Sequence, residues 1–85
     1  MSVIHTWSRF STAEAKAETL EEVRHTDVLI TVYGGKPERY EVGPMTYNAD
    51  GECMVWLTEP GSDGSQTTGQ MFVSDIQQVE VLHNA

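Results

Sequence analysis

The sequence predicts one small α+β domain, residues 1–85, in which an N-terminal helix packs on a strongly bent, five-stranded antiparallel sheet. Three observations lead to this fold class. A chain of 85 residues builds a single hydrophobic core of modest size. An alanine- and glutamate-rich stretch near the start has helical periodicity. From Asp27 onward, short runs of β-branched and aromatic residues alternate with turn-forming residues, which is typical of strands.

The helix is predicted over about residues 12–25, within the stretch FSTAEAKAETLEEVRH. Ser11 precedes Glu14 by three residues, a spacing at which each side chain can cap the backbone N–H of the other residue. Steps of four and three residues place an apolar stripe on one face, made of Ala13, Ala17, Leu20 and Val23. The glutamates between them mostly face water. Because the stripe is narrow and its side chains are small, we expect the helix to lie against a sheet.

Five strands are predicted, over about residues 28–33, 38–47, 53–58, 70–74 and 78–83. The opening SVIHTW is strand-like or irregular. Gly34-Gly35 and the stretch from Asn48 to Gly51 are turn signals. Gly43-Pro44 interrupts the second strand, and because proline has no N–H to donate, a bulge or bend is expected there. A single turn around Ser74 to Ile76 joins the last two strands.

This order of elements resembles that of small SH3-like and Sm-like barrels. The segment GQMFVSDIQQVEVL is similar to the fourth strand, the one-turn 3₁₀ connection and the fifth strand of such barrels, and DVLITVYGGKPERYEVG is similar to the first two strands. The resemblance covers about residues 10–82 and implies a sheet that closes into a small barrel. It also implies RNA binding, as in Sm-like proteins, or ligand sensing, as in WYL-type domains. The positions that would bind RNA are acidic or neutral here, including Asn48, Asp50 and Glu52.

The charge of the chain is strongly negative and unevenly distributed. The 13 acidic and five basic residues give a formal net charge of −8. All five bases lie in residues 1–39, whose net charge is −1, whereas residues 40–85 contain seven acids and no lysine or arginine. Because nucleic-acid affinity comes largely from cations that neutralise phosphates, direct nucleic-acid binding is disfavoured. The same field favours a basic protein surface as the partner.

No group of residues in the sequence indicates an enzyme, a metal site or a cofactor. Cys53 has no histidine at the close spacing of metal ligands or of a nucleophile and its base, and we expect it to be a small core residue. A single cysteine cannot form an internal disulfide, which favours the cytoplasm. We expect neither a signal peptide nor a membrane span, because no apolar run is long enough.

The candidate site is therefore a surface for protein binding. The predicted contact residues are Glu41, Asp50, Glu52, Trp56, Glu59 and Asp63. Trp56 belongs to an outward-facing band with Met54 and Thr58, which Phe72 and Tyr33 can join. Two interpretations of this band stay open: either the N-terminal helix and VIHTW cover it, or Trp56 anchors a partner. The scattered acids also have two interpretations, as a recognition face or as a means of solubility.

The function favoured by these features is that of a non-enzymatic, acidic, protein-binding module. It would regulate or inhibit a basic, nucleic-acid-handling protein by imitating the charge of a phosphate backbone, and in size and charge it is similar to small inhibitors encoded by phages and mobile elements. One alternative is an Sm-like or WYL-like barrel that oligomerises and binds a nucleotide or small ligand. Another is a small structural part of a larger assembly, which docks through the Trp56 band or through its last strand. An exposed last strand can also pair with a second copy.

Overall fold

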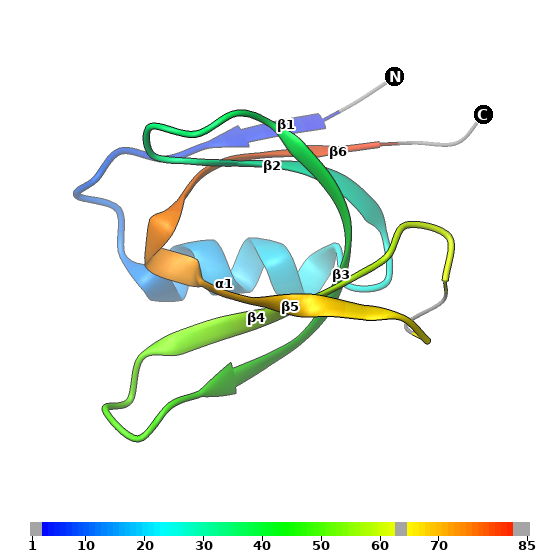
Figure 1. Ribbon diagram of the computed structural model, residues 1–85. Coiled ribbons are helices and arrows are strands. Elements are labelled where there is room, and N and C mark those ends of the chain that lie inside the picture. Colours follow the sequence, from blue (N-terminus) through cyan, green and yellow to red (C-terminus); the bar gives the residue numbers. More distant parts are fainter. Residues whose placement is uncertain (1–2, 63–64, 83–85) are drawn as a thin grey trace.

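The computed structural model describes residues 3–62 and 65–82 and contains one α-helix and six strands in these residues (Figure 1). In chain order the elements are β1 (Val3–Thr6), α1 (Ala13–Glu22), β2 (Asp27–Val32), β3 (Glu38–Tyr47), β4 (Cys53–Thr58), β5 (Thr67–Phe72), the 3₁₀ turn η1 (Val73–Asp75) and β6 (Ile76–Val81). The α+β class is confirmed. Asp63, a predicted contact residue, and position 83, the end of the last predicted strand, lie outside the described residues.

The prediction of a closed five-stranded barrel is wrong. The six strands form one antiparallel sheet in the order β1-β6-β2-β3-β4-β5, and this sheet is open and not strongly curled. Closure would require the two edge strands, β1 and β5, to pair with each other. In Figure 1, β1, β6 and β2 lie at the top of the view, β4 and β5 lie lower, and β3 runs between the two groups.

The stretch interpreted above as strand-like or irregular explains the difference. Val3 to Thr6 form β1, which pairs with β6 along Val3↔Val81 to Thr6↔Gln78. The other edge of β6 pairs with β2. Both edges of the last strand are therefore occupied, and β6 cannot take a strand from a second copy. The turn η1 is present as predicted, and it carries the chain from the outermost strand β5 to a strand on the far side of β2.

The core lies between α1 and the sheet. Leu20 is the fully buried apolar residue of the helix, and it packs with valine, leucine and isoleucine side chains of the strands and η1, namely Val28, Ile30, Val42, Val55, Leu57, Val73, Ile76, Val79 and Val81. Ala13, Ala17 and Val23 pack against this cluster, which confirms the predicted stripe. Cys53 is half-buried against the core, as expected for a small core residue.

The helix begins one residue later than the Ser11–Glu14 spacing predicts. Thr12 is the N-cap, and its hydroxyl accepts a hydrogen bond from the backbone N–H of Ala15 at 3.2 Å. The hydroxyl of Ser11 instead accepts one from the backbone N–H of Ser8. With Thr12 as the cap, the third helical position is an alanine, so no glutamate completes a capping box. Threonine and serine are both good caps, and the competing bond to Ser8 decides between them.

Two local predictions in the sheet are confirmed. The pairing of β3 with β4 shifts register between Val42 and Met45, at Gly43-Pro44. Asn48 closes the β3–β4 turn, because its side-chain oxygen accepts hydrogen bonds from the backbone N–H groups of Asp50 and Glu52. Gly51 has a φ of 78° in this turn, a conformation that glycine adopts without steric cost.

We expect Gly43→Ala to destabilise the protein by about 1–3 kcal/mol, because a methyl group would be overpacked there. A Cβ atom on Gly43 would lie 2.8 Å from the Trp56 carbonyl oxygen and 3.2 Å from the Trp56 Cβ atom, and backbone of a central strand cannot move aside easily. Urea denaturation measures the change. Gly69→Ala is the matched control, since no atom lies within 4 Å of a Cβ built on that strand glycine. Equal stability of the two variants would contradict the prediction.

One basic residue is buried. Lys16, in α1, is 1% exposed, and its ammonium donates hydrogen bonds to the Ser74 carbonyl oxygen at 3.2 Å and to the Tyr33 hydroxyl at 3.4 Å. The Tyr33 hydroxyl in turn donates to the carbonyl oxygen of Trp7 at 3.3 Å. Lys16 therefore ties the helix to η1, to the end of β2 and to the segment after β1. Among the described residues no carboxylate forms an ion pair with it.

Candidate functional site

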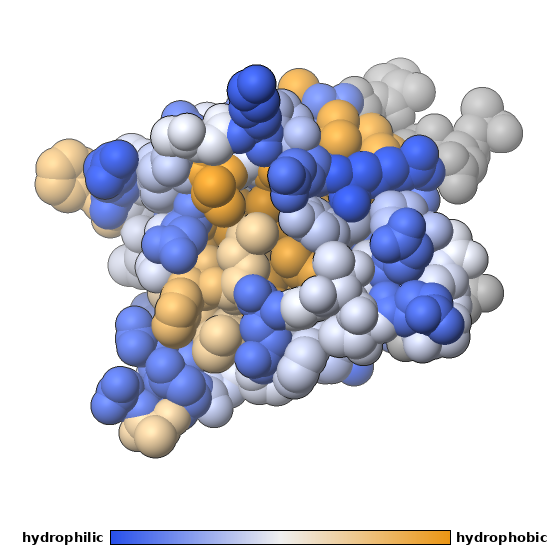
Figure 2. All heavy atoms as spheres, in the orientation of Figure 1, coloured by the Kyte–Doolittle hydropathy of each residue, from blue (hydrophilic) through white to orange (hydrophobic). Residues whose placement is uncertain are grey.

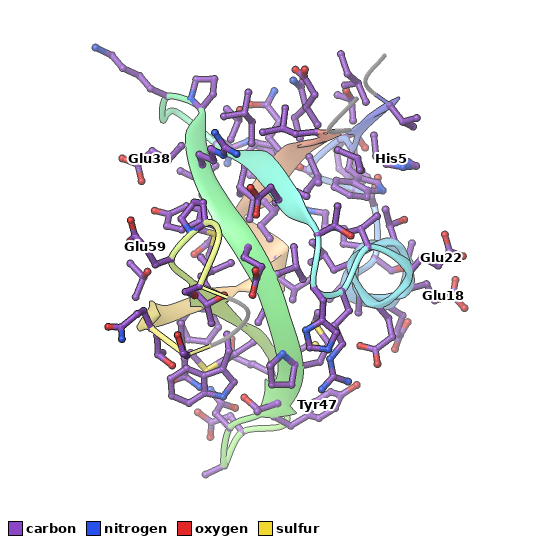
Figure 3. The ribbon with its side chains drawn as sticks, turned by 90° about the vertical axis from the view of Figure 1, so that its right-hand side faces the viewer. His5, Glu18, Glu22, Glu38, Tyr47 and Glu59 are labelled. Carbon is purple, nitrogen blue, oxygen red and sulfur yellow. The ribbon has the colours of Figure 1, made fainter. Side chains whose placement is uncertain are left out.

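A strongly charged concave surface lies between α1 and the end of β3. Its volume is about 780 Å³. Met45 and Tyr47 of β3 and Ala17 of the helix line it, together with four helix carboxylates, those of Glu14, Glu18, Glu21 and Glu22. Figure 3 shows Glu18 and Glu22 projecting from α1 and Tyr47 at the end of β3 below the helix. We call this surface the acidic groove.

The charge of the acidic groove is largely uncompensated. Arg24 forms an ion pair with Glu21 at 3.5 Å, but both side chains are exposed, so solvent screens the pair. Glu14, Glu18 and Glu22 follow each other at intervals of four residues on one side of α1. Like charges at this spacing destabilise a helix by about 0.2–0.5 kcal/mol per pair. The carboxylate stripe therefore lowers the stability of the helix that carries it.

A smaller and more enclosed hollow of about 230 Å³ adjoins the acidic groove. The two share Glu14, Ala17 and Tyr47. The hollow adds the thiol of Cys53 and the carboxylate of Glu52, whose oxygen accepts a hydrogen bond from the side-chain amide of Asn48 at 3.2 Å. Because Tyr47 is 70% exposed, its ring is free to contact a bound group at the junction of the two cavities.

The contact residues predicted from the sequence lie in different parts of the structure. Glu52 lines the small hollow, and Asp50 lies beside it in the same turn. Glu59 follows the opposite end of β4, and Figure 3 places it on the side of the sheet away from α1. Glu41 is 3% exposed, and its carboxylate accepts a hydrogen bond from the Thr58 hydroxyl at 3.1 Å, so a partner cannot reach it. Asp63 lies outside the described residues.

The interpretation that α1 covers the Trp56 band is wrong at Trp56, although Lys16 of α1 contacts Tyr33, with its ammonium 3.4 Å from the Tyr33 hydroxyl. In the β3–β4 ladder, Met45 pairs with Val55 and Tyr47 with Cys53, so these four side chains share the face on which the helix lies. Trp56 follows Val55 and points to the opposite face. It is half-buried, and its Cβ atom and carbonyl group pack closely on Gly43. Trp56 therefore lies outside the acidic groove.

A tyrosine with a perturbed pKa lies in β3, away from the acidic groove. The Tyr40 hydroxyl donates a hydrogen bond to the carboxylate of Glu38. This hydrogen bond raises the pKa of Tyr40, and burial and the negative charge of Glu38 raise it further. The folded state thus keeps the Tyr40 proton at pH values at which the unfolded chain has lost it.

We expect the stability contributed by Tyr40 to be complete below about pH 10, the ordinary pKa of tyrosine, and to be lost as the pH rises through the folded-state pKa. Glu38→Gln removes the charge and the carboxylate acceptor, so it should lower the pKa of Tyr40. Carbon-13 NMR of the tyrosine rings measures that pKa directly. An unchanged Tyr40 titration in Glu38→Gln would show that burial, and not Glu38, raises the pKa.

The part of the chain that the structure describes contains neither a cluster of metal ligands nor a membrane-spanning helix. No group of three or more histidine, cysteine, aspartate or glutamate side chains there is arranged to hold a metal ion. No helix among these residues has the length and apolar character needed to cross a membrane.

Sequence reasoning missed the helix carboxylates as a site and assigned them to solvent. The net charge of each half of the chain does not reveal these glutamates, because the acidic and basic residues of the segment 1–39 nearly cancel. In the structure the basic residues of this half offset the groove only in part: Lys16 is buried, Arg39 forms an ion pair with Asp27 at 2.7 Å, and the ion pair of Arg24 with Glu21 is exposed. The i, i+4, i+8 spacing of Glu14, Glu18 and Glu22 was the available signal. Comparison of the chain with protein-family models, with curated proteins and with solved structures found no match.

Proposed function

We propose that this protein is a non-enzymatic binding module that receives a basic surface of a partner protein in the acidic groove and thereby regulates or inhibits that partner. The observation that carries the proposal is the groove itself. It combines four carboxylates on one helix with the exposed ring of Tyr47 and the thioether of Met45.

The groove has both components of a protein-binding surface. Exposed ion pairs are worth little one at a time, but several carboxylates around one groove create a field that attracts a cationic partner and increases its association rate. Tyr47 and Met45 provide contact area, and tyrosine also binds a lysine or arginine cation over its ring. A partner with lysine or arginine close to an apolar side chain fits this combination.

The proposed partner is a protein that handles nucleic acids. Such proteins carry clusters of lysine and arginine that neutralise phosphates. A row of carboxylates on α1, extended by Glu52 and Asp50 in the adjacent turn, offers negative charges to the same cations. Occupation of that basic surface would exclude the nucleic acid and inhibit the partner.

The alternative of an Sm-like or WYL-like barrel loses its basis, because the sheet is open. Docking through the last strand loses its basis as well, because β1 and β2 occupy both edges of β6.

The test is affinity capture from host lysate with immobilised wild-type protein, Glu18→Lys and Glu59→Lys, at about 50 mM and about 300 mM salt. Glu18 and Glu59 are both exposed, and their reversal changes the net charge equally, but only Glu18 lines the acidic groove. We expect a basic protein on the wild type and on Glu59→Lys at low salt, less of it at high salt, and none on Glu18→Lys. Equal capture by all three proteins would overturn the proposal.

A further inference from the structure

The outermost strand β5 has an unprotected edge. It pairs with β4, and within residues 3–62 and 65–82 no other strand pairs with it. Edge strands are usually protected by charged residues, proline or a bulge. The sequence of β5, TTGQMF, has no charge and no proline. Its irregularity is confined to the Thr67 end, and residues 69–72 pair regularly with β4. The outer N–H and C=O groups of this stretch are available to a further strand.

An apolar groove of about 530 Å³ lies beside that edge. It separates the end of β2 from β5, and its apolar lining comes from Val32, Met54, Met71 and Phe72. In Figure 2, which has the orientation of Figure 1, apolar side chains form an orange patch in the middle of the face, between β2 and β5. Methionine side chains adapt to differently shaped partners because they are unbranched and flexible.

The position of the groove and the charge of the chain define the occupant. A segment that pairs with β5 must be extended, and an extended segment presents alternate side chains to the same side. Those that face the groove must be apolar. Asp75 is the charged residue among those that line the groove, and its carboxylate is exposed, while Arg9 lies over the ring of Tyr33 at 4.8 Å. With a net charge of −8 on each copy, a second copy of this chain is repelled, whereas a segment that carries lysine or arginine is attracted.

We propose that β5 and the apolar groove form a second binding site, which takes an extended segment of another protein by strand addition. In this segment apolar side chains, which enter the groove, alternate with lysine or arginine. The site shares no lining residue with the acidic groove or the adjoining hollow, so it does not depend on the proposed function.

The test uses the full chain and a blocked peptide of about eight residues in which valine alternates with lysine and arginine. NMR-detected hydrogen exchange follows the backbone amides of residues 69–72. We expect the outward-facing amides among them to exchange at least about tenfold more slowly with saturating peptide, because a ladder hydrogen bond protects them. A peptide with proline at a central valine keeps the charge but cannot complete the ladder, and it should give no protection.

Two substitutions at one exposed position provide the matched pair. Gln70 lies on the groove rim, so Gln70→Lys should weaken peptide binding at least about tenfold by repulsion, whereas Gln70→Glu should not. Glu18→Lys shows whether the peptide acts through the acidic groove, and protection of β5 should persist in this variant. The proposal is overturned if the peptide does not change amide exchange in β5 or if the proline peptide protects these amides equally. It is also overturned if Glu18→Lys abolishes the protection. Protection of β5 by higher protein concentration alone would indicate self-association and would overturn it too.

Discussion

Lys16→Ala is expected to lower the free energy of unfolding by about 2–4 kcal/mol, the range for truncating a large buried side chain. For a domain of this size the melting temperature should fall by about 10–25 °C. The substitution removes the apolar stem that fills space beneath α1. It also leaves the Ser74 carbonyl oxygen and the Tyr33 hydroxyl without their shared donor. Thermal and urea unfolding, followed by circular dichroism, measure both quantities.

Lys16→Met separates the two contributions, because methionine keeps most of the volume and removes the charge. The Ser74 carbonyl oxygen and the Tyr33 hydroxyl lose their donor in this variant too, so we expect it to be less stable than the wild type by about 1–3 kcal/mol but more stable than Lys16→Ala. If Lys16→Met is as unstable as Lys16→Ala, the hydrogen bonds of Lys16 stabilise the contact of α1 with η1 and Tyr33, and the packing of its side chain does not. If Lys16→Ala is as stable as the wild type, the junction between α1, η1 and Tyr33 does not depend on Lys16.

Glu18→Lys is expected to weaken binding of the basic partner at least about tenfold while making the free protein more stable. Glu18 has like-charged neighbours at Glu14, Glu21 and Glu22, three and four residues away on the same helix. Reversal of its charge converts these repulsions into attractions and should stabilise α1 by about 1 kcal/mol in total. The melting temperature should rise by about 4–8 °C. Isothermal titration and thermal unfolding of the same preparations measure the two effects.

Glu59→Lys again serves as the control, since Glu59 lies outside α1 and outside the acidic groove. It should leave both binding and melting temperature nearly unchanged. If Glu18→Lys raises the melting temperature and weakens partner binding, Glu18 contributes to binding and lowers the stability of the fold. A Glu18→Lys protein that melts lower and binds as well as the wild type would contradict both the repulsion argument and the assignment of the groove.

Local rules predicted those parts of the fold that depend on neighbouring residues. The interruption at Gly43-Pro44, the turn closed by Asn48, the 3₁₀ turn before β6 and the apolar stripe of α1 each follow from a few adjacent side chains. The order of the strands in the sheet does not follow from adjacent side chains. Whether β6 pairs with β1 or with β5 depends on contacts between residues more than 70 positions apart, and VIHT carries only a weak strand signal.

Two residues show why the candidate site was also misjudged. Lys16 precedes Leu20 by four residues and therefore lies on the same side of the helix, but its charge suggests a surface position. Glu41 lies between Arg39 and Val42 in a strand that alternates clearly, yet it is buried beside Thr58 on the outer face of the sheet. Charge predicts exposure only on average, and tertiary partners decide each case.

The place of β6 between β1 and β2 governs the order in which the chain can fold. Among the described strands, β6 is the last to be synthesised, and it is the sole pairing partner of β1 and the second partner of β2. Until it emerges from the ribosome, the sheet can extend only from β2 to β5, with Val28 and Ile30 on an uncovered edge. Contacts of such long sequence separation slow folding. A nascent chain halted before β6 would therefore expose β1, β2 and much of the core, and it would be prone to aggregation.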